Sequence, residues 1–203
     1  MRVRIIFSKQ GALRYTGHLD LHKIWERSIR RAKLPLAYSQ GYHPQPKINL
    51  AAALPLGFSS KAEVMDMWLN EDVEDVLPTL QAHVPPGLTI MQAETVDDRK
   101  PSLQSQVIAA EYQVEITEAG HASGLTEKIA SVLESESIHR VRRKKSYDLR
   151  PLIEELTAPD DEHIHMHLTA REGATGRPEE VLDAMGIPLE DTRIERTKLH
   201  FKE

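Results

Sequence analysis

Hydrophobic residues alternate with polar ones over residues 2–7, which is the period-two pattern of a strand with one buried face. Val3, Ile5 and Phe7 fall on one face, and Arg2 and Arg4 fall on the other. The pattern predicts an opening strand whose apolar face meets the core and whose two arginines face solvent.

The apolar spacing then changes to that of a helix. Apolar residues recur three and four positions apart from Leu21 to Ala32, and Pro35 ends the run. The rest of the first half is predicted as a short extended piece at residues 36–39, strands at 48–54, 63–69 and 88–93, and a helix at 73–84. The order β-α-β-β-α-β is that of the split βαβ, or ferredoxin-like, unit.

A second, looser copy of this order follows a polar stretch at residues 97–106, which has the composition of a linker. Its predicted elements are strands or extended pieces at 110–117, 138–143, 164–168 and 193–201 and helices at 125–133 and 178–185. We therefore expect an α+β protein of two tandem ferredoxin-like units with antiparallel sheets. The expected domains are residues 1–96 and 107–203. This duplication rests on element order, because no residue-level repeat is visible.

Composition narrows the class of protein. The 203 residues are 40% hydrophobic, which is enough for an ordinary core, and they include no cysteine. Disulfides, thiolate zinc sites, cysteine nucleophiles and iron–sulfur clusters held by cysteine are thereby excluded. The opening apolar run is too short for a signal peptide, and no stretch is long enough to span a membrane, so a soluble, cytoplasmic protein is expected.

Charge is distributed unevenly along the chain. The first fifty residues hold ten lysines and arginines against two acids, Asp20 and Glu26, a formal charge of +8 within a chain of net charge −5. Four of these cations lie on the polar face of the first predicted helix: Lys23, Arg27, Arg30 and Arg31. Such a stripe favours binding of a polyanion, although a solvated basic helix face is the plain alternative.

A second basic cluster lies in the other half of the chain, at Arg142, Arg143, Lys144 and Lys145. Tyr147 beside it has a ring that could stack on a base. The alternative interpretation is a charged hairpin tip.

A loop at residues 40–47 combines glycine, two prolines, Tyr42, His43 and Lys47. Glycine allows close approach of a ligand to the backbone, the prolines stiffen the loop, and the tyrosine and histidine offer a stacking face and a titratable group. A recognition loop is consistent with these residues, but residue types alone favour a proline-rich turn.

Histidines do not point to a metal. His18 and His22 have the i, i+4 spacing of a helical metal site, with His43 as a conceivable third ligand, but no zinc-protease signature accompanies them. His18 or Asp20 as a helix cap is the better interpretation. His163, His165 and His167 alternate with apolar residues along one strand, which indicates a wet sheet face. No metal and no cofactor are expected.

Several motifs together resemble a known family. The runs at residues 6–20, 38–46 and 54–57 are similar to those of the radical-SAM-linked protein family of unknown function, and residues 147–153 and the stretch from Gly176 match more loosely. The resemblance implies either a free-standing chain encoded beside a B12-binding radical SAM protein or a domain fused behind one. The resemblance implies a radical SAM protein as partner. The chain departs from the family at position 43, where it has His and the family often has Asn.

The resemblance also implies a division of labour, in which the partner holds the cluster and the radical chemistry and this chain supplies substrate binding or docking. Relatives are often encoded near a ribonuclease of the E/G type and near ribosomal proteins of the large subunit. This association favours RNA or ribosome components as the substrate. The leading hypothesis is a non-catalytic accessory protein that binds RNA, or an RNA- or ribosome-associated substrate, for a radical SAM enzyme. The residues expected to bind nucleic acid are Arg2, Arg4, Lys9, Arg14, Lys23, Arg27, Arg30, Arg31, Tyr42, His43, Lys47, Arg142, Arg143, Lys144 and Lys145.

Two other classes of function stay open. One is a metal-independent endoribonuclease of the CRISPR-RNA-processing type, in which His18 or His43 would be the general acid or base. The other is a protein-docking module whose basic face meets an acidic patch on the radical SAM partner. The sequence does not define an oligomeric state.

Overall fold

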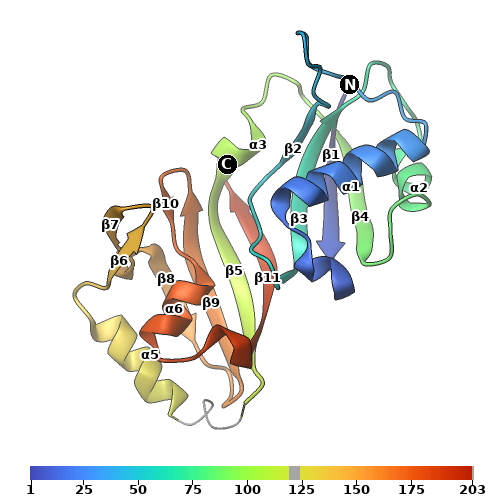
Figure 1. The fold of residues 1–203 in the computed structure, drawn as a ribbon. Helices are drawn as coiled ribbons and strands as arrows, with labels where there is room; N and C mark the ends of the chain where they lie inside the picture. The colour runs from blue at the N-terminus through green and yellow to red at the C-terminus, as the bar shows by residue number, and fades with distance from the viewer. Residues whose placement is uncertain (119–123, 203) are drawn as a thin grey trace. The chain divides into compact units, whose positions relative to one another are not determined.

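The computed structural model describes residues 1–118 and 124–202, which fall into two compact units that divide between Gln106 and Val107 (Figure 1). Each unit combines helices with an antiparallel sheet, so the α+β class predicted from the sequence is confirmed. None of the described helices is long and apolar enough to cross a membrane.

Unit 1 has the predicted β-α-β-β-α-β order. Its elements are β1 (Arg2–Lys9), the 3-10 helix η1 (Gly11–Tyr15), α1 (His18–Arg31), β2 (Ile48–Leu50), β3 (Ser59–Trp68), α2 (Val76–Gln81), β4 (Leu88–Val96) and α3 (Leu103–Gln106). The strands pair antiparallel in the order β2-β3-β1-β4. This places β1 and β3 at the centre of the sheet, as in the split βαβ unit.

The core of unit 1 lies between α1 and the sheet, which Figure 1 shows behind the helix. Phe7 of β1 and Trp25 of α1 are fully buried and meet edge to face, with ring centroids 4.7 Å apart. Ile29 is also fully buried, one helical turn from Trp25. Because the helix turns its apolar stripe to the sheet, the opposite stripe is left to solvent.

The two arginines of β1 were predicted to face solvent, but they form ion pairs within unit 1. Both bind Asp66 of β3, which is fully buried: Arg2 Nη2 lies 2.6 Å from Asp66 Oδ2, and Arg4 Nε lies 2.9 Å from Asp66 Oδ1. Arg2 is 2% exposed and also lies over the ring of Trp68. A buried carboxylate requires partners, and Asp66 finds them in these two arginines. Because Asp66 is far from β1 in the sequence, the local pattern of β1 cannot reveal it.

The stretch predicted as a polar linker contacts unit 1. The guanidinium of Arg2 donates to the carbonyl oxygens of Lys100 and Pro101, at 2.8 and 3.1 Å. Gln104 Nε2 in α3 donates to the carbonyl oxygen of Leu50, at 2.8 Å. These bonds extend unit 1 to the end of α3.

Unit 2 repeats the connectivity with additions. Its elements are β5 (Val107–Ile116), α5 (Leu125–Glu134), β6 (His139–Arg142), β7 (Lys145–Asp148), η2 (Arg150–Leu152), β8 (Ile153–Thr157), β9 (His163–Arg171), β10 (Ala174–Thr175), α6 (Pro178–Ala184), η3 (Leu189–Asp191) and β11 (Thr192–Phe201). The strands β8-β9-β5-β11 pair antiparallel in that order, which is the order of unit 1.

One strand of unit 2 was assigned wrongly from the sequence. The extended piece predicted at residues 138–143 is β6, which pairs only with β7 in a separate hairpin. The second strand of the sheet is β8, where Glu154 and Glu155 interrupt the apolar alternation. The hairpin is therefore an addition between α5 and β8.

The polar face of β9 agrees with its prediction. Ile164, Met166 and Leu168 are fully buried, and the histidines between them are half-buried on the opposite face. Figure 1 shows α6 in front of β8 and β9, with α5 beside β8.

Candidate functional site

The exposed stripe of α1 is basic, as predicted. Lys23, Arg27, Arg30 and Arg31 are all exposed, because the buried stripe of Leu21, Trp25 and Ile29 turns them outward. Lys23 lies 3.7 Å from Asp20, an ion pair open to solvent and therefore weak. Within the described residues, no carboxylate lies in ion-pair distance of the three arginines, which line a shallow hollow.

Part of this stripe has a structural explanation. Arg30 and Arg31 occupy the last turn of α1, where cations interact favourably with the helix dipole by about 0.3–1 kcal/mol each. Arg27 opposes that benefit, because like charges three and four positions apart cost about 0.2–0.5 kcal/mol per pair. The dipole therefore does not account for the whole stripe.

Lys33 is a further exposed cation, two residues after the end of α1, and was not among the predicted residues. It follows the C-cap Ala32 with φ of 56°, the left-handed conformation that a glycine usually supplies at this position. Its amide donates to Arg30 O at 3.1 Å, and the amide of Leu34 donates to Ile29 O at 3.2 Å. These are the two bonds of a Schellman motif. We call Lys23, Arg27, Arg30, Arg31 and Lys33 the α1 basic face.

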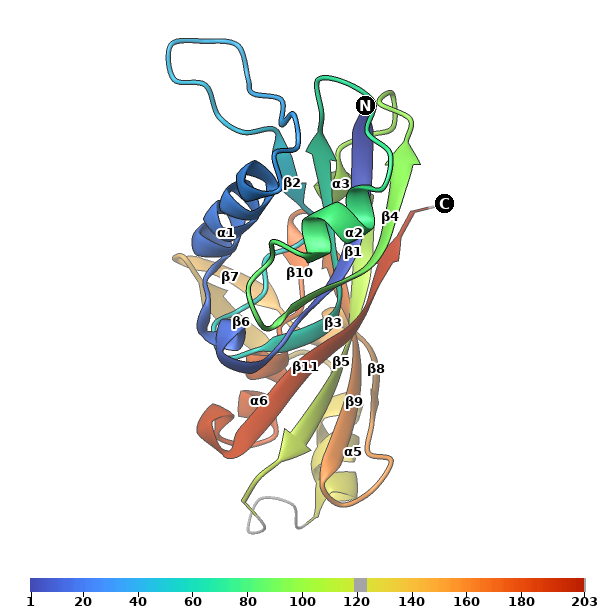
Figure 2. The ribbon, with the colours of Figure 1, turned by 90° about the vertical axis from the view of Figure 1, so that its right-hand side faces the viewer.

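The loop after α1 projects from unit 1 and is closed at its base by hydrogen bonds. Ser39 N donates to Gln45 O at 2.8 Å, and Gln45 N donates to Ser39 Oγ at 2.9 Å, so the loop is narrow at its base. Tyr42 at its tip is 96% exposed, and its ring meets the ring of His43 edge-on at 5.2 Å. Figure 2 shows the loop rising beyond the end of α1 and β2.

The loop and α1 are connected through β2. His22 Nε2 lies 3.3 Å from the carbonyl oxygen of Ile48, directly after the exposed Lys47. The backbone of Lys47 is fixed on both sides, since its amide donates to Ala37 O at 2.8 Å and its carbonyl accepts from Trp68 N at 3.1 Å. An exposed tyrosine and a lysine thus lie on a loop whose base is held by hydrogen bonds and which rises beyond the end of α1.

Lys9 does not belong to this surface. It was predicted to contact nucleic acid, but it is fully buried and its Nζ donates to Thr16 O at 3.3 Å. With Arg2 and Arg4 engaged by Asp66, three of the predicted phosphate contacts are internal. Arg2 and Arg4 were misplaced because the alternating pattern identifies the face of a strand, but not what covers it, whereas Lys9 continues the buried alternation of Val3, Ile5 and Phe7.

Arg14 is half-buried and lies in a separate cluster. Its guanidinium stacks over the ring of Tyr15, 4.7 Å from the centroid. Gly57 N donates to Arg14 O at 2.8 Å, which brings the 6–20 and 54–57 motifs together. Three large apolar side chains in these two motifs and at the start of α1 are each more than 60% exposed: Tyr15, Leu19 and Leu56.

The basic cluster predicted at Arg142, Arg143, Lys144 and Lys145 lies across the turn of the β6–β7 hairpin, and its members differ in exposure. Arg143 and Lys144 are the two turn residues, with φ of 49° and 66°, and together with Lys145 they are exposed. Positive φ at both central positions is the requirement of a type I′ turn, which asparagine and glycine usually meet. The charged tip named as the alternative is thus what the structure contains.

Arg142 and Tyr147 are internal contacts of the hairpin. Arg142 Nη2 lies 2.6 Å from Glu180 Oε2 of α6 and stacks over the ring of Tyr147, whose hydroxyl donates to the same carboxylate. Burial raises the pKa of Tyr147 to about 12, and the hydrogen bond and charge of Glu180 act in the same direction. Neither side chain is free to meet a phosphate or a base, contrary to the prediction.

The first-turn residues of α1 do not cap it. The N-cap is Gly17, which has no side chain, and His18 and Asp20 lie in the first turn, so neither occupies the N-cap position predicted for it. His18 is exposed in the first turn, and His43 lies on the projecting loop. In the described part of the chain, the group of side chains placed to hold a metal is a different one, Glu111, His167 and His200 of unit 2.

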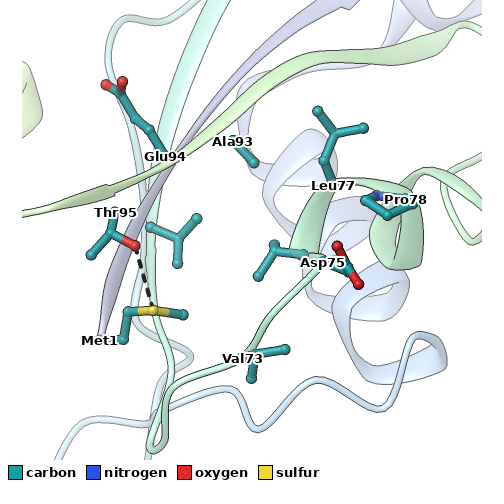
Figure 3. Close-up of a pocket in the computed structure, with 10 residues that line it drawn as sticks. Met1, Val73, Asp75, Leu77, Pro78, Ala93, Glu94 and Thr95 are labelled. Atoms are coloured by element: carbon teal, nitrogen blue, oxygen red, sulfur yellow. Dashed lines mark hydrogen bonds between the residues drawn. The ribbon is translucent and has the colours of Figure 1, made fainter.

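Unit 1 also contains a hollow between α2 and the β1–β4 edge, about 250 Å³ in volume (Figure 3). Val73, Leu77 and Ala93 give it apolar walls, and Asp75 and Glu94 are its charged residues. Because both of its charged side chains are acidic, this hollow does not suit a phosphate group.

Residues 2–178 match a protein family described as uncharacterized protein conserved in bacteria, DUF2344. No match to a curated protein is found.

Proposed function

Because the chain belongs to the DUF2344 family of bacterial proteins, whose description names no activity, we propose a function from its surface chemistry. The protein is a non-catalytic accessory protein that binds RNA, or an RNA- or ribosome-associated substrate, for a radical SAM enzyme. The observation that carries this proposal is the α1 basic face, where Arg27, Arg30 and Arg31 are exposed and have no carboxylate partner within the described residues.

The chemistry of this face suits a phosphate backbone. Guanidinium groups make bidentate hydrogen bonds to phosphate, and three of them on one helical stripe can follow successive phosphates. Their mutual repulsion falls when an anion binds. Such contacts position a nucleic acid without reading its sequence.

The projecting loop supplies a second kind of contact. Tyr42 is almost completely exposed on a loop whose base is held by backbone bonds, so its ring can stack on an unpaired base at little entropic cost. Base stacking is characteristic of single-stranded RNA recognition, in which bases are turned outward. We therefore propose a single-stranded or looped RNA in preference to a duplex.

Backbone conformation supports a functional role for the cations. Among the described residues, four that are not glycine have positive φ, and three of these are Lys33, Arg143 and Lys144. The left-handed conformation costs about 1–2 kcal/mol for a residue with a Cβ, and glycine would avoid that cost. Lysine and arginine at positions that favour glycine are consistent with a functional role for their charge.

The radical SAM partner is proposed from the resemblance of the motifs at residues 6–20, 38–46 and 54–57. The chain has no cysteine, so the thiolate ligands of an iron–sulfur cluster would come from the partner. In this arrangement the accessory chain holds the substrate and the partner performs the reaction.

Binding of a labelled single-stranded RNA to the full chain tests the proposal. The charge reversal R27E/R30E/R31E should weaken binding by about 100-fold or more at 0.1 M salt, if each arginine neutralises one phosphate. The matched control R99E/R171E/R193E makes the same change in net charge at exposed positions that are not part of the α1 basic face, and it should retain most of the affinity.

Equal loss in both triple variants would show a nonspecific effect of net charge and would contradict the proposal. Intact RNA after incubation in EDTA is expected, whereas cleavage would favour a nuclease. Capture of the radical SAM protein that survives nuclease treatment and is lost in R27E/R30E/R31E would assign the face to protein docking instead.

A further inference from the structure

The polar face of the unit 2 sheet gathers histidines from two strands around one carboxylate. Glu111 of β5 is directly opposite His167 of β9 in the sheet register, and Lys198 of β11 is opposite Glu111 on its other side. His200 lies two residues beyond Lys198 on the same strand. Strand pairing therefore holds the three backbones in fixed positions.

The side chains converge as well as the backbones. His200 Nε2 lies 2.6 Å from Glu111 Oε1, and the rings of His167 and His200 stack with centroids 4.7 Å apart and planes inclined by 23°. The candidate ligand atoms of Glu111, His167 and His200 all lie within 4.8 Å of one another.

One polar atom in this group lacks a hydrogen bond. His167 Nε2 is buried from solvent and has no hydrogen-bond partner among the described residues, although Glu154 Oε2 is 3.4 Å from it. Buried nitrogen atoms are normally satisfied, so an unsatisfied one next to a carboxylate and a second imidazole needs an explanation. A bound cation would provide it.

We propose that Glu111, His167 and His200 form a zinc site. Two imidazole nitrogens and one carboxylate oxygen are a donor set that Zn²⁺ accepts, while Mg²⁺ and Ca²⁺ prefer oxygen ligands alone. Ligands about 2.1 Å from a tetrahedral metal are about 3.4 Å apart, which lies between the 2.6 Å and 4.8 Å separations of this group. Small rotations of the side chains therefore suffice to form it.

The surroundings are compatible with a cation. The imidazole nitrogens of His200 and His165 lie 2.6 Å and 3.6 Å from the two carboxylate oxygens of Glu111. Lys198 Nζ is 3.9 Å from Glu111 Oε1, and its side chain is 60% exposed, so it can turn into solvent. Glu154 Oε2 lies 3.4 Å from His167 Nε2, so a further carboxylate is close to the ligands.

Three protein ligands leave one tetrahedral position for water. That coordination differs from closed structural zinc sites, which use four protein ligands. The proposed site also joins β9, β5 and β11 of one sheet. It was not foreseen from the sequence because Glu111 and His200 are 89 residues apart.

Calorimetric titration of the untagged full chain with ZnCl₂ at neutral pH tests the site. One Zn²⁺ per chain is expected, with an increase in Tm, and MgCl₂ should give no binding. The variants H167A, H200A and E111Q should each weaken zinc binding by at least about 10-fold. The control H163A changes a histidine on the same strand that is bound to Asp160, and it should bind zinc like the wild type.

Co²⁺ substitution gives an independent readout, since a tetrahedral site with nitrogen ligands produces visible absorption bands that H200A should lose. E111Q keeps the shape of the side chain, so it decides the question if an alanine variant fails to fold. Absence of saturable zinc binding in the wild type, or equal binding in the wild type and E111Q, would overturn the proposal.

Discussion

Arg2 and Asp66 form a fully buried ion pair on neighbouring strands of unit 1, with Arg2 Nη2 2.6 Å from Asp66 Oδ2. Arg4 shares the same carboxylate, which therefore bonds to two guanidinium groups. Together the three side chains remove two predicted phosphate contacts from the surface and join β1 to β3.

Replacing the shared carboxylate should be strongly destabilising. D66A leaves Arg2 buried without its counter-charge, and removal of one partner of a buried ion pair costs about 3–5 kcal/mol. Urea unfolding followed by circular dichroism measures this loss. RNA affinity measured on the fraction that folds should not change, and a loss of binding without a loss of stability would contradict the assignment of Asp66 to the core.

Lys33 should show a conflict between stability and function. K33G removes the strain of the left-handed C′ position of α1 and should stabilise unit 1 by about 1 kcal/mol. It also removes a cation of the α1 basic face and should weaken RNA binding. Denaturant unfolding and RNA titration measure the two effects.

The matched variant K33A separates them, because alanine removes the charge and keeps the strain. It should lose RNA affinity to the same extent as K33G without a gain in stability. If K33G binds RNA as well as the wild type does, Lys33 is not part of the interface.

The hairpin tip should behave in the same way in unit 2. Asn and Gly suit a type I′ turn, so R143N/K144G should raise stability by about 1 kcal/mol or more. Binding of RNA should fall if the tip contributes, and R143Q/K144Q is the control that removes the charges without relaxing the turn. Thermal unfolding and RNA titration of the three proteins test this.

Asp148 should make stability depend on pH. Hydrogen bonds from the amides of Ile138 and Arg150, at 2.8 and 3.0 Å, lower the pKa of Asp148 in the folded state. A lowered folded-state pKa means that the stabilisation is present above the unfolded pKa of about 3.9 and is lost as the pH falls through the folded pKa.

D148N should therefore be less stable than the wild type at pH 7, and the difference should shrink below about pH 4. Urea unfolding of both proteins from pH 7 to pH 3 provides the comparison. A difference that stays constant over this range would show that the charge of Asp148 has no part in holding the ends of the β6–β7 hairpin.

Local patterns in the sequence were sufficient for much of the fold. The apolar stripe that includes Trp25 and Ile29 was sufficient to identify α1 and its exposed basic face. Alternation around Met166 identified β9 and its polar side. The strand β8 was missed because two glutamates interrupt its pattern, so its place in the sheet follows from pairing with β9 and not from its own residues.

The candidate sites were less predictable, since they depend on contacts between distant residues. Burial of Lys9 and the pairing of Arg142 with Glu180 cannot be inferred from charge runs, because a charge run does not reveal which carbonyl or carboxylate lies opposite. The convergence of Glu111 with His200 depends on the register of two strands. The loop that carries Tyr42 could be predicted because its two prolines exclude a continuous helix or a central strand, whereas the almost complete exposure of the tyrosine could not.

The salt dependence of RNA binding tests the central claim most directly. Each phosphate neutralised adds about 0.7 to the slope of log affinity against log salt for a single strand, so R27A/R30A/R31A should reduce the slope by about 2 relative to the wild type. The control R99A/R171A/R193A should keep the wild-type slope. A wild-type slope near zero, or an unchanged slope in R27A/R30A/R31A, would contradict the claim that the α1 basic face holds RNA.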